Sequence, residues 1–139
     1  MFRPHRPSWV KKYVGIPFAY KGRTPAGADC YGLICLVYRN EYHIVLADYL
    51  YDDNPNRNDI ARLFYDGKSS PSWRMVVFHQ PGDIVLFHTQ GVPFHCGLII
   101  DDQYMLHTSE KIESCIERFT RPEWRNRILA FYRHKEMPA

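Results

Sequence analysis

The apolar residues of the chain change their spacing about half-way along it. Between residues 29 and 42 they recur at helical intervals, as at Leu33, Ile34 and Val37. Beyond Pro81 they come in short runs that are separated by turn residues. This order predicts helices in the first half and strands in the second, which is typical of an α+β domain.

The first half predicts helices at residues 8–14, 29–42 and 58–65. Ser8 and Asp29 are suitable N-caps for the first two, because their side-chain oxygens accept hydrogen bonds from unpaired backbone N–H groups. Residues 15–28 contain three glycines and two prolines, a density that predicts a loop. Residues 1–7 are expected to form a loose arm.

The second half contains short segments with the length and composition of strands. They cover residues 73–78, 83–88, 94–100, 104–108, 114–119 and 128–133. The connections between them are short, which favours antiparallel pairing. We therefore expect the helix at 29–42 to pack on an antiparallel sheet of five to six strands.

The bulk properties exclude several classes of protein. A chain of 139 residues is expected to form one domain, spanning residues 1–139. No apolar run approaches the roughly 18 residues of a membrane-spanning helix. The net charge of +3 is dispersed, so nucleic acid is not an expected partner. No apolar run follows the basic N-terminus, so we expect no signal peptide and synthesis in the cytoplasm.

Cys30 stands where the helix at 29–42 is expected to begin. Unpaired N–H groups and the positive end of the helix dipole favour a thiolate there, which lowers the thiol pKa. Cys30 is therefore the candidate nucleophile. Cys35, Cys96 and Cys115 lie among apolar residues and are expected to be small buried hydrophobes.

A predicted hairpin positions two histidines. If residues 101–103 form a three-residue turn, Gly97 lies opposite His107. His95 then lies diagonally across from His107 on the same face, within reach of its imidazole. A two-residue turn would reverse the parity and separate the two rings. Gly97 is expected to mark close approach by the helix start that carries Cys30.

A thiol, an imidazole base and a second imidazole that orients the base form the kind of triad that nucleophilic catalysis uses. Cys30 would be the nucleophile, His95 the general base and His107 the orienting residue. The same three residues would also suit zinc. The chain has no CxxC motif, however, so neither a metal nor a cofactor is expected. The other histidines are expected to be structural or on the surface.

Four motifs resemble, in order, those of the NlpC/P60 family of papain-like cysteine peptidases. They are Gly15–Gly22 (family pattern G-x-P-Y-x-x-G-G), Asp29–Leu33 (D-C-S-G-hydrophobic), Pro81–Phe87 (P-G-D-L-V-x-F) and His95–Ile100 (H-V-G-I-Y-hydrophobic). Met105–His107 is similar to the strand that carries the third polar residue. The resemblance covers about residues 8–134.

This resemblance implies a papain-like core and the roles given above for Cys30, His95 and His107. It implies that the substrate is the stem peptide of peptidoglycan, cut between the γ-carboxyl of D-glutamate and a diamino acid. Substrate contacts are expected at Phe18, Asp29 and Tyr31.

The chain also departs from the family pattern. Phe18 replaces the usual Tyr, and Tyr31 replaces the Ser that usually follows the nucleophile. With the long insert before Pro81 and the segment 121–133, these features resemble the branch found in phage and prophage tails. That branch implies tail proteins as partners and action in the virion tail or at the cell wall. The alternatives are a tail-tip assembly protein with weak or protein-directed cleavage, and an acyltransferase on the same core.

Overall fold

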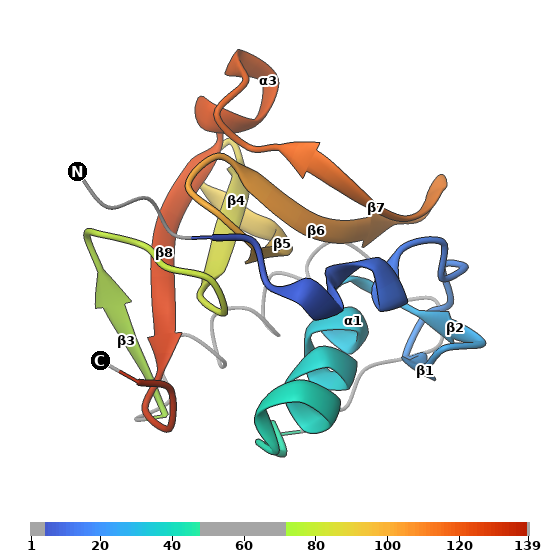
Figure 1. Ribbon diagram of the computed structural model, residues 1–139. Coiled ribbons are helices and arrows are strands. Elements are labelled where there is room, and N and C mark those ends of the chain that lie inside the picture. The colour runs from blue at the N-terminus through green and yellow to red at the C-terminus, as the bar shows by residue number, and fades with distance from the viewer. Residues whose placement is uncertain (1–4, 48–71, 139) are drawn as a thin grey trace.

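A six-stranded antiparallel sheet forms the centre of the domain (Figure 1). The computed structural model describes residues 5–47 and 72–138, and the helix expected at 58–65 lies outside these ranges. The strand order is β3-β8-β4-β5-β6-β7. The strands are β3 (Trp73–Val76), β4 (Ile84–Thr89), β5 (Val92–Ile99), β6 (Tyr104–Ser109), β7 (Ile112–Arg118) and β8 (Ile128–His134). Each overlaps a segment expected to be a strand, so the predicted α+β architecture is confirmed.

The helix α1 (Cys30–Val37) packs on this sheet and continues into a π-helical turn, η2 (Tyr38–Tyr42). Asp29 is its N-cap, as predicted, and its side chain accepts a hydrogen bond from the backbone N–H of Gly32. The helical segment ends at His43, whose φ of 57° places it in the left-handed region. Both ends of the predicted helix are therefore confirmed.

The segment before α1 differs from expectation in two details. A 3₁₀ helix, η1 (Ser8–Tyr13), begins at Ser8 itself, and the capping position is Pro7, which has no side chain to accept a hydrogen bond. The prediction that Ser8 is the cap was therefore wrong. The loop that follows contains the short paired strands β1 (Arg23–Thr24) and β2 (Gly27–Ala28).

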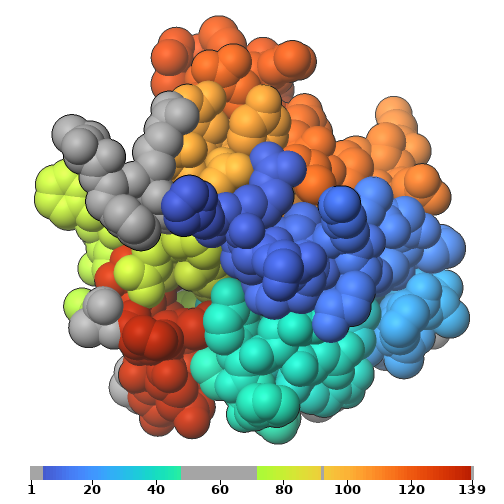
Figure 2. Space-filling view, viewed as in Figure 1, coloured from blue at the N-terminus to red at the C-terminus, as the bar shows by residue number. Residues whose placement is uncertain are grey.

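The N-terminal segment covers the junction between α1 and β7. Ser114 in β7 accepts a hydrogen bond from the N–H of Ile16 at 2.7 Å and donates one to the carbonyl of Tyr13 at 2.5 Å. The N–H of Gly15 also donates to the carbonyl of Ser114 at 2.8 Å. In Figure 2 this blue segment lies between α1 and the orange strands.

The apolar residues form two cores. The larger includes Leu33, Leu36, Val37, Leu86, Leu98 and Leu106. The smaller includes Val85, Phe87, Ile99, Met105 and Phe119, with Trp124 packed against it. Trp124 belongs to a short helix that was not predicted, α3 (Pro122–Arg125), which begins with a proline. Because side chains alternate along a strand, Cys96 points to the larger core, whereas His95 and His107 share the face of the smaller one.

A buried ion pair joins the turn before β4 to β8. Asp83 is fully buried, and its two carboxylate oxygens accept hydrogen bonds from Nε and Nη2 of Arg133, both at 2.8 Å. The N–H of Gln80 donates to the same carboxylate, and Arg133 donates to the carbonyl of Phe78. These further hydrogen bonds offset the cost of burying the two charges.

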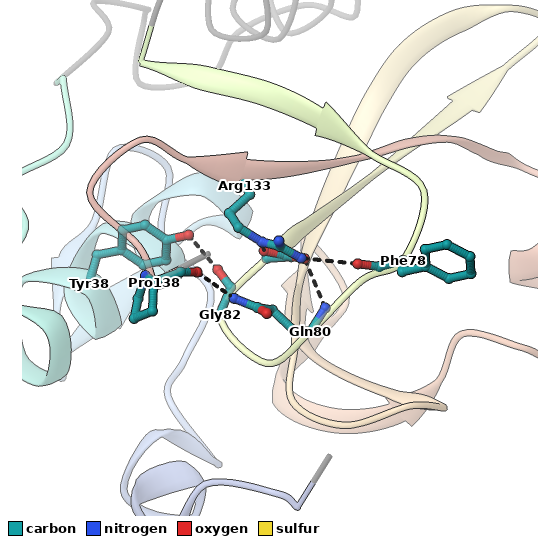
Figure 3. A network of polar contacts seen from close by, with 7 residues as sticks. Tyr38, Phe78, Gln80, Gly82, Arg133 and Pro138 are labelled. Carbon is teal, nitrogen blue, oxygen red and sulfur yellow. Dashed lines mark hydrogen bonds and ion pairs between the residues drawn. The ribbon is translucent and has the colours of Figure 1, made fainter. Parts of the chain in front are cut away.

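The same turn is tied to η2 and to the C-terminal segment. The hydroxyl of Tyr38 donates a hydrogen bond to the carbonyl of Gly82, and the side-chain amide of Gln80 donates to the carbonyl of Pro138 (Figure 3). Figure 3 shows both contacts on one side of the Arg133 guanidinium and the carbonyl of Phe78 on the other. The Pro81–Asp83 motif therefore anchors the sheet.

Candidate active site

Cys30 is the first residue of α1, and its side chain is partly exposed. Its pKa is lowered to about 5, chiefly by a hydrogen bond from the thiol of Cys96 and then by the hydrogen bond and charge of His95, against the opposing effect of burial. Burial and the neighbouring sulfur raise the pKa of Cys96 well above its usual value. Cys96 therefore stays a thiol and donates to the Cys30 thiolate.

Asp29 holds the approach loop against the start of α1. One carboxylate oxygen accepts hydrogen bonds from the N–H of Gly32 at 2.7 Å and from Nη1 of Arg23 at 3.1 Å. The other accepts from the N–H of Lys21 at 2.8 Å. Gly32 permits this approach, since a Cβ built there would lie 1.9 Å from the carbonyl oxygen of Gly22.

The hairpin places the two histidines together, as the turn parity predicted. Leu98 pairs with Leu106 and Ile99 with Met105, a register that puts Gly97 opposite His107. Nε2 of His95 lies 3.0 Å from Nδ1 of His107. Both rings are buried, so solvent competes little for this hydrogen bond.

The explanation expected for Gly97 was wrong. The three heavy atoms nearest to a Cβ built at Gly97 all belong to Met105, with Sδ at 2.7 Å. The glycine therefore makes room for the side chain of Met105 on the neighbouring strand.

Glu117 and Trp124 extend the chain of contacts, and the sequence analysis missed both. Nε2 of His107 lies 2.8 Å from Oε1 of Glu117, and Oε2 of Glu117 accepts a hydrogen bond from Nε1 of Trp124 at 2.6 Å. The indole also stacks on His95, with ring centroids 5.5 Å apart. Extending the predicted hairpin by one strand places position 117 on the same face of β7 as Cys115, opposite His107, and would have identified Glu117.

The hydrogen bonds define the tautomers of both imidazoles. A carboxylate only accepts, so Nε2 of His107 carries the proton and Nδ1 accepts from Nε2 of His95. Nδ1 of His95 is then the atom left for Cys30. Burial, followed by the charge of His95, lowers the pKa of His107 to about 4, which keeps this ring neutral at pH 7.

The three residues expected to contact substrate each make different contacts within the protein. Phe18 is half-buried and meets Tyr20 edge to face, with ring centroids 5.0 Å apart. Tyr31 is only 6% exposed, and its hydroxyl donates to the carbonyl of Ala47 at 2.6 Å. Asp29 contacts the approach loop as described. Their roles toward substrate remain predictions.

The remaining histidines and cysteines that the structure describes have structural contacts. His79 stacks on Phe131, and His134 meets Trp73 edge to face. The four cysteines form no disulfide. In the described ranges, the side chains that lie close enough together to hold a metal ion are those of His107, Cys115 and Glu117. This group differs from the zinc set considered from the sequence, which was Cys30, His95 and His107.

Comparison with known families identifies the fold. The model of the NlpC/P60 family matches residues 15–133. The chain belongs to the NlpC/P60 family. Within the described residues, no helix has both the length and the apolar character needed to cross a membrane.

Two solved NlpC/P60 structures illustrate the similarity. One is an NLP/P60-family protein from Staphylococcus aureus Mu50 that is described as similar to a lipoprotein. It is 21% identical in sequence, with a TM-score of 0.63, and the match covers 90% of this chain and 38% of that chain. An NlpC/P60 family protein from Bacillus cereus ATCC 10987 is 20% identical with a TM-score of 0.65, over 93% and 41%. These likenesses confirm the NlpC/P60 fold.

The curated relatives are enzymes of the bacterial cell wall by name. Murein DD-endopeptidase MepS/Murein LD-carboxypeptidase of Escherichia coli K12 is 22% identical over 113 residues, which is 81% of this chain. The match spans about half, 53%, of that relative.

Proposed function

We propose that this chain is a cysteine peptidase that hydrolyses the stem peptides of peptidoglycan. The observation that carries the proposal is the series of contacts from His95 through His107 to Glu117, at whose free end His95 lowers the pKa of the Cys30 thiol. A nucleophile, a base and groups that orient the base are the parts that thiol-dependent acyl transfer needs. Cys30, His95 and His107 are the proposed catalytic residues.

The chemistry proceeds in two stages. The Cys30 thiolate attacks the scissile carbonyl, and the backbone N–H groups at the start of α1 stabilise the resulting oxyanion. His95, protonated at Nδ1, gives this proton to the leaving amine, and an acyl-enzyme forms. His95 then takes a proton from water, whose oxygen attacks the thioester and releases the acid product.

The substrate class is supported by sequence resemblance and by the names of relatives. The motifs at Gly15–Gly22 and Asp29–Leu33 resemble those of enzymes that cut between D-glutamate and a diamino acid. The curated relative is named a DD-endopeptidase and an LD-carboxypeptidase, which cut other bonds of the same polymer. We propose the D-γ-glutamyl–diamino acid bond, and Phe18 and Tyr31, with Asp29, as determinants of substrate fit.

Digestion of purified peptidoglycan, with product identification by mass spectrometry, tests this function. Wild type should release fragments that end in D-glutamate, and Cys30→Ala should release none. Cys115→Ala is the matched control and should retain activity. It also removes one thiol, but Cys115 is not a member of the series Cys30, His95, His107 and Glu117, which we call the relay. Fragments cut at a D-Ala bond would reassign the scissile bond, whereas products without hydrolysed peptide would favour the acyltransferase.

We further propose that the chain acts in a phage or prophage tail, where it opens the cell wall locally. The support is the resemblance of Tyr31, the insert before Pro81 and the segment 121–133 to that branch of the family. Detection of the protein in purified virions by mass spectrometry tests this location. If Cys30 is labelled selectively by a thiol probe but no wall fragment is released, the tail-tip assembly role takes precedence.

A further inference from the structure

Three metal-ligating side chains meet beside the proposed relay. His107 and Cys115 are directly paired on β6 and β7, and Glu117 lies two residues further along β7 on the same face. One ligand atom from each lies within 4.8 Å of the others. We propose that these residues form an inhibitory zinc site that controls the tautomers of the relay.

The donor set suits zinc better than a hard cation. One imidazole, one thiolate and one carboxylate are the nitrogen, sulfur and oxygen ligands that Zn²⁺ prefers. Tetrahedral zinc holds such atoms roughly 3.3–3.8 Å apart. The atoms of this cluster lie within 4.8 Å of one another, so small shifts suffice: the wider spacing closes, and the contact between His107 and Glu117, now 2.8 Å, opens. Three protein ligands leave the fourth position for water.

Two of the ligands already have the supporting contacts that metal sites use. Nδ1 of His107 is held by His95 at 3.0 Å, which leaves Nε2 directed at the cluster. Oε2 of Glu117 is held by Trp124 at 2.6 Å, which leaves Oε1 directed at His107. Contacts of this kind orient ligands before a metal arrives.

The cluster is reachable although one ligand is deeply buried. His107 is 1% exposed at its side chain, whereas Glu117 is 32% exposed, and Cys115 is half-buried. A metal ion can therefore enter from the side of Glu117 and Cys115. The hydrogen bond between Glu117 and His107 would open to admit it.

Zinc on Nε2 of His107 would reverse the relay. The proton now on Nε2 and the thiol proton of Cys115 leave to solvent, and the proton between the rings moves from Nε2 of His95 to Nδ1 of His107. Nε2 of His95 then faces a donor and cannot hold a proton. The imidazolium that partners the Cys30 thiolate therefore cannot form, and acyl transfer stops. This consequence rests on the proposed function, but the binding of zinc does not.

The first test measures zinc binding to the whole chain by titration calorimetry with zinc chloride. Wild type and Cys30→Ala should each bind one ion, and Cys115→Ala should bind it at least about 100-fold more weakly, since even supporting contacts contribute tenfold to 100-fold. Retention by Cys115→Ala together with loss by Cys30→Ala would place the ion on the Cys30–His95 pair and overturn the proposal. Absence of binding to wild type would also overturn it.

The second test follows alkylation of Cys30 by iodoacetamide, with the labelled peptide identified by mass spectrometry. Zinc should slow this labelling at least tenfold in wild type and leave it unchanged in Cys115→Ala. Equal slowing in both proteins would overturn the proposal. Neither test needs peptidoglycan. If both give the expected results but the protein does not digest cell wall, the proposed function is wrong and the zinc site stands.

Discussion

Oε1 of Glu117 lies 2.8 Å from Nε2 of His107, at the end of the relay opposite Cys30. The two residues come from adjacent strands, and the carboxylate is also held by Trp124 of α3. Because a carboxylate cannot donate, this contact holds the Nε2 protons of both imidazoles on the side away from Cys30 and leaves Nδ1 of His95 to face the thiol. We therefore propose Glu117 as a positioning residue, and its contribution can be measured.

Glu117→Gln should slow both peptidoglycan digestion and alkylation of Cys30, by on the order of 10²-fold or more. The Gln side chain can donate to Nε2 of His107, and this favours the wrong tautomer in both rings. The melting temperature should change little, since the side chain is partly exposed and similar in shape. Unchanged alkylation with a lowered melting temperature would mean that Glu117 is structural.

Trp124→Phe is the companion variant. It keeps an aromatic ring over His95 but removes the N–H that holds Oε2 of Glu117. The carboxylate keeps its contact with His107, so we expect a fall in digestion rate of roughly tenfold, smaller than in Glu117→Gln. An equal or larger fall would show that stacking on His95 matters more than the hydrogen bond.

The pH dependence of Cys30 alkylation tests the contact with Cys96. Thiolate is present above the thiol pKa, so labelling should decline as the pH falls through about 5. Cys96→Val removes the S–H donor and should move this midpoint upward. Valine is the residue at this position in the family pattern quoted above. Burial and nearby carboxylates raise the pKa of Cys115, so this thiol should react only at alkaline pH. An unchanged midpoint in Cys96→Val would refute the role of the second thiol.

Gly32→Ala should destabilise the fold by about 3 kcal/mol, near the upper end for overpacked sites, because its Cβ would lie 1.9 Å from the carbonyl oxygen of Gly22. Urea denaturation measures this change. Gly91→Ala is the control, since it meets nothing within 4 Å and strains only the backbone at φ +80°, at a cost of about 1 kcal/mol. Similar losses in both variants would mean that the approach loop moves aside.

Arg133→Met should lower the free energy of unfolding by about 3–5 kcal/mol, because it leaves the fully buried Asp83 carboxylate without its partner. Combining it with Asp83→Asn removes both charges and should restore part of the loss. Urea denaturation of the wild type, the single variants and the double variant gives the coupling free energy. Additive losses would mean that the coupling free energy is zero and that the attraction between the two charges does not stabilise the fold.

Local rules predicted much of this protein from its sequence. The Asp29 cap, the helix beginning at Cys30 and the strands follow from spacing and capping, which act over a few residues. The pairing of Gly97 opposite His107 followed from the parity of a single turn, because side chains alternate strictly along a strand.

Packing between distant segments decided the rest. Cys96 donates to Cys30 across 66 positions of sequence, and no periodicity reports that distance. Met105 rather than α1 fills the space over Gly97, because a glycine marks a close approach without naming what approaches. Trp124 reaches His95 only once α3 lies on the end of the sheet. The sequence determined the elements and the place of the proposed nucleophile on one of them, and the tertiary structure determined which side chains complete the proposed site.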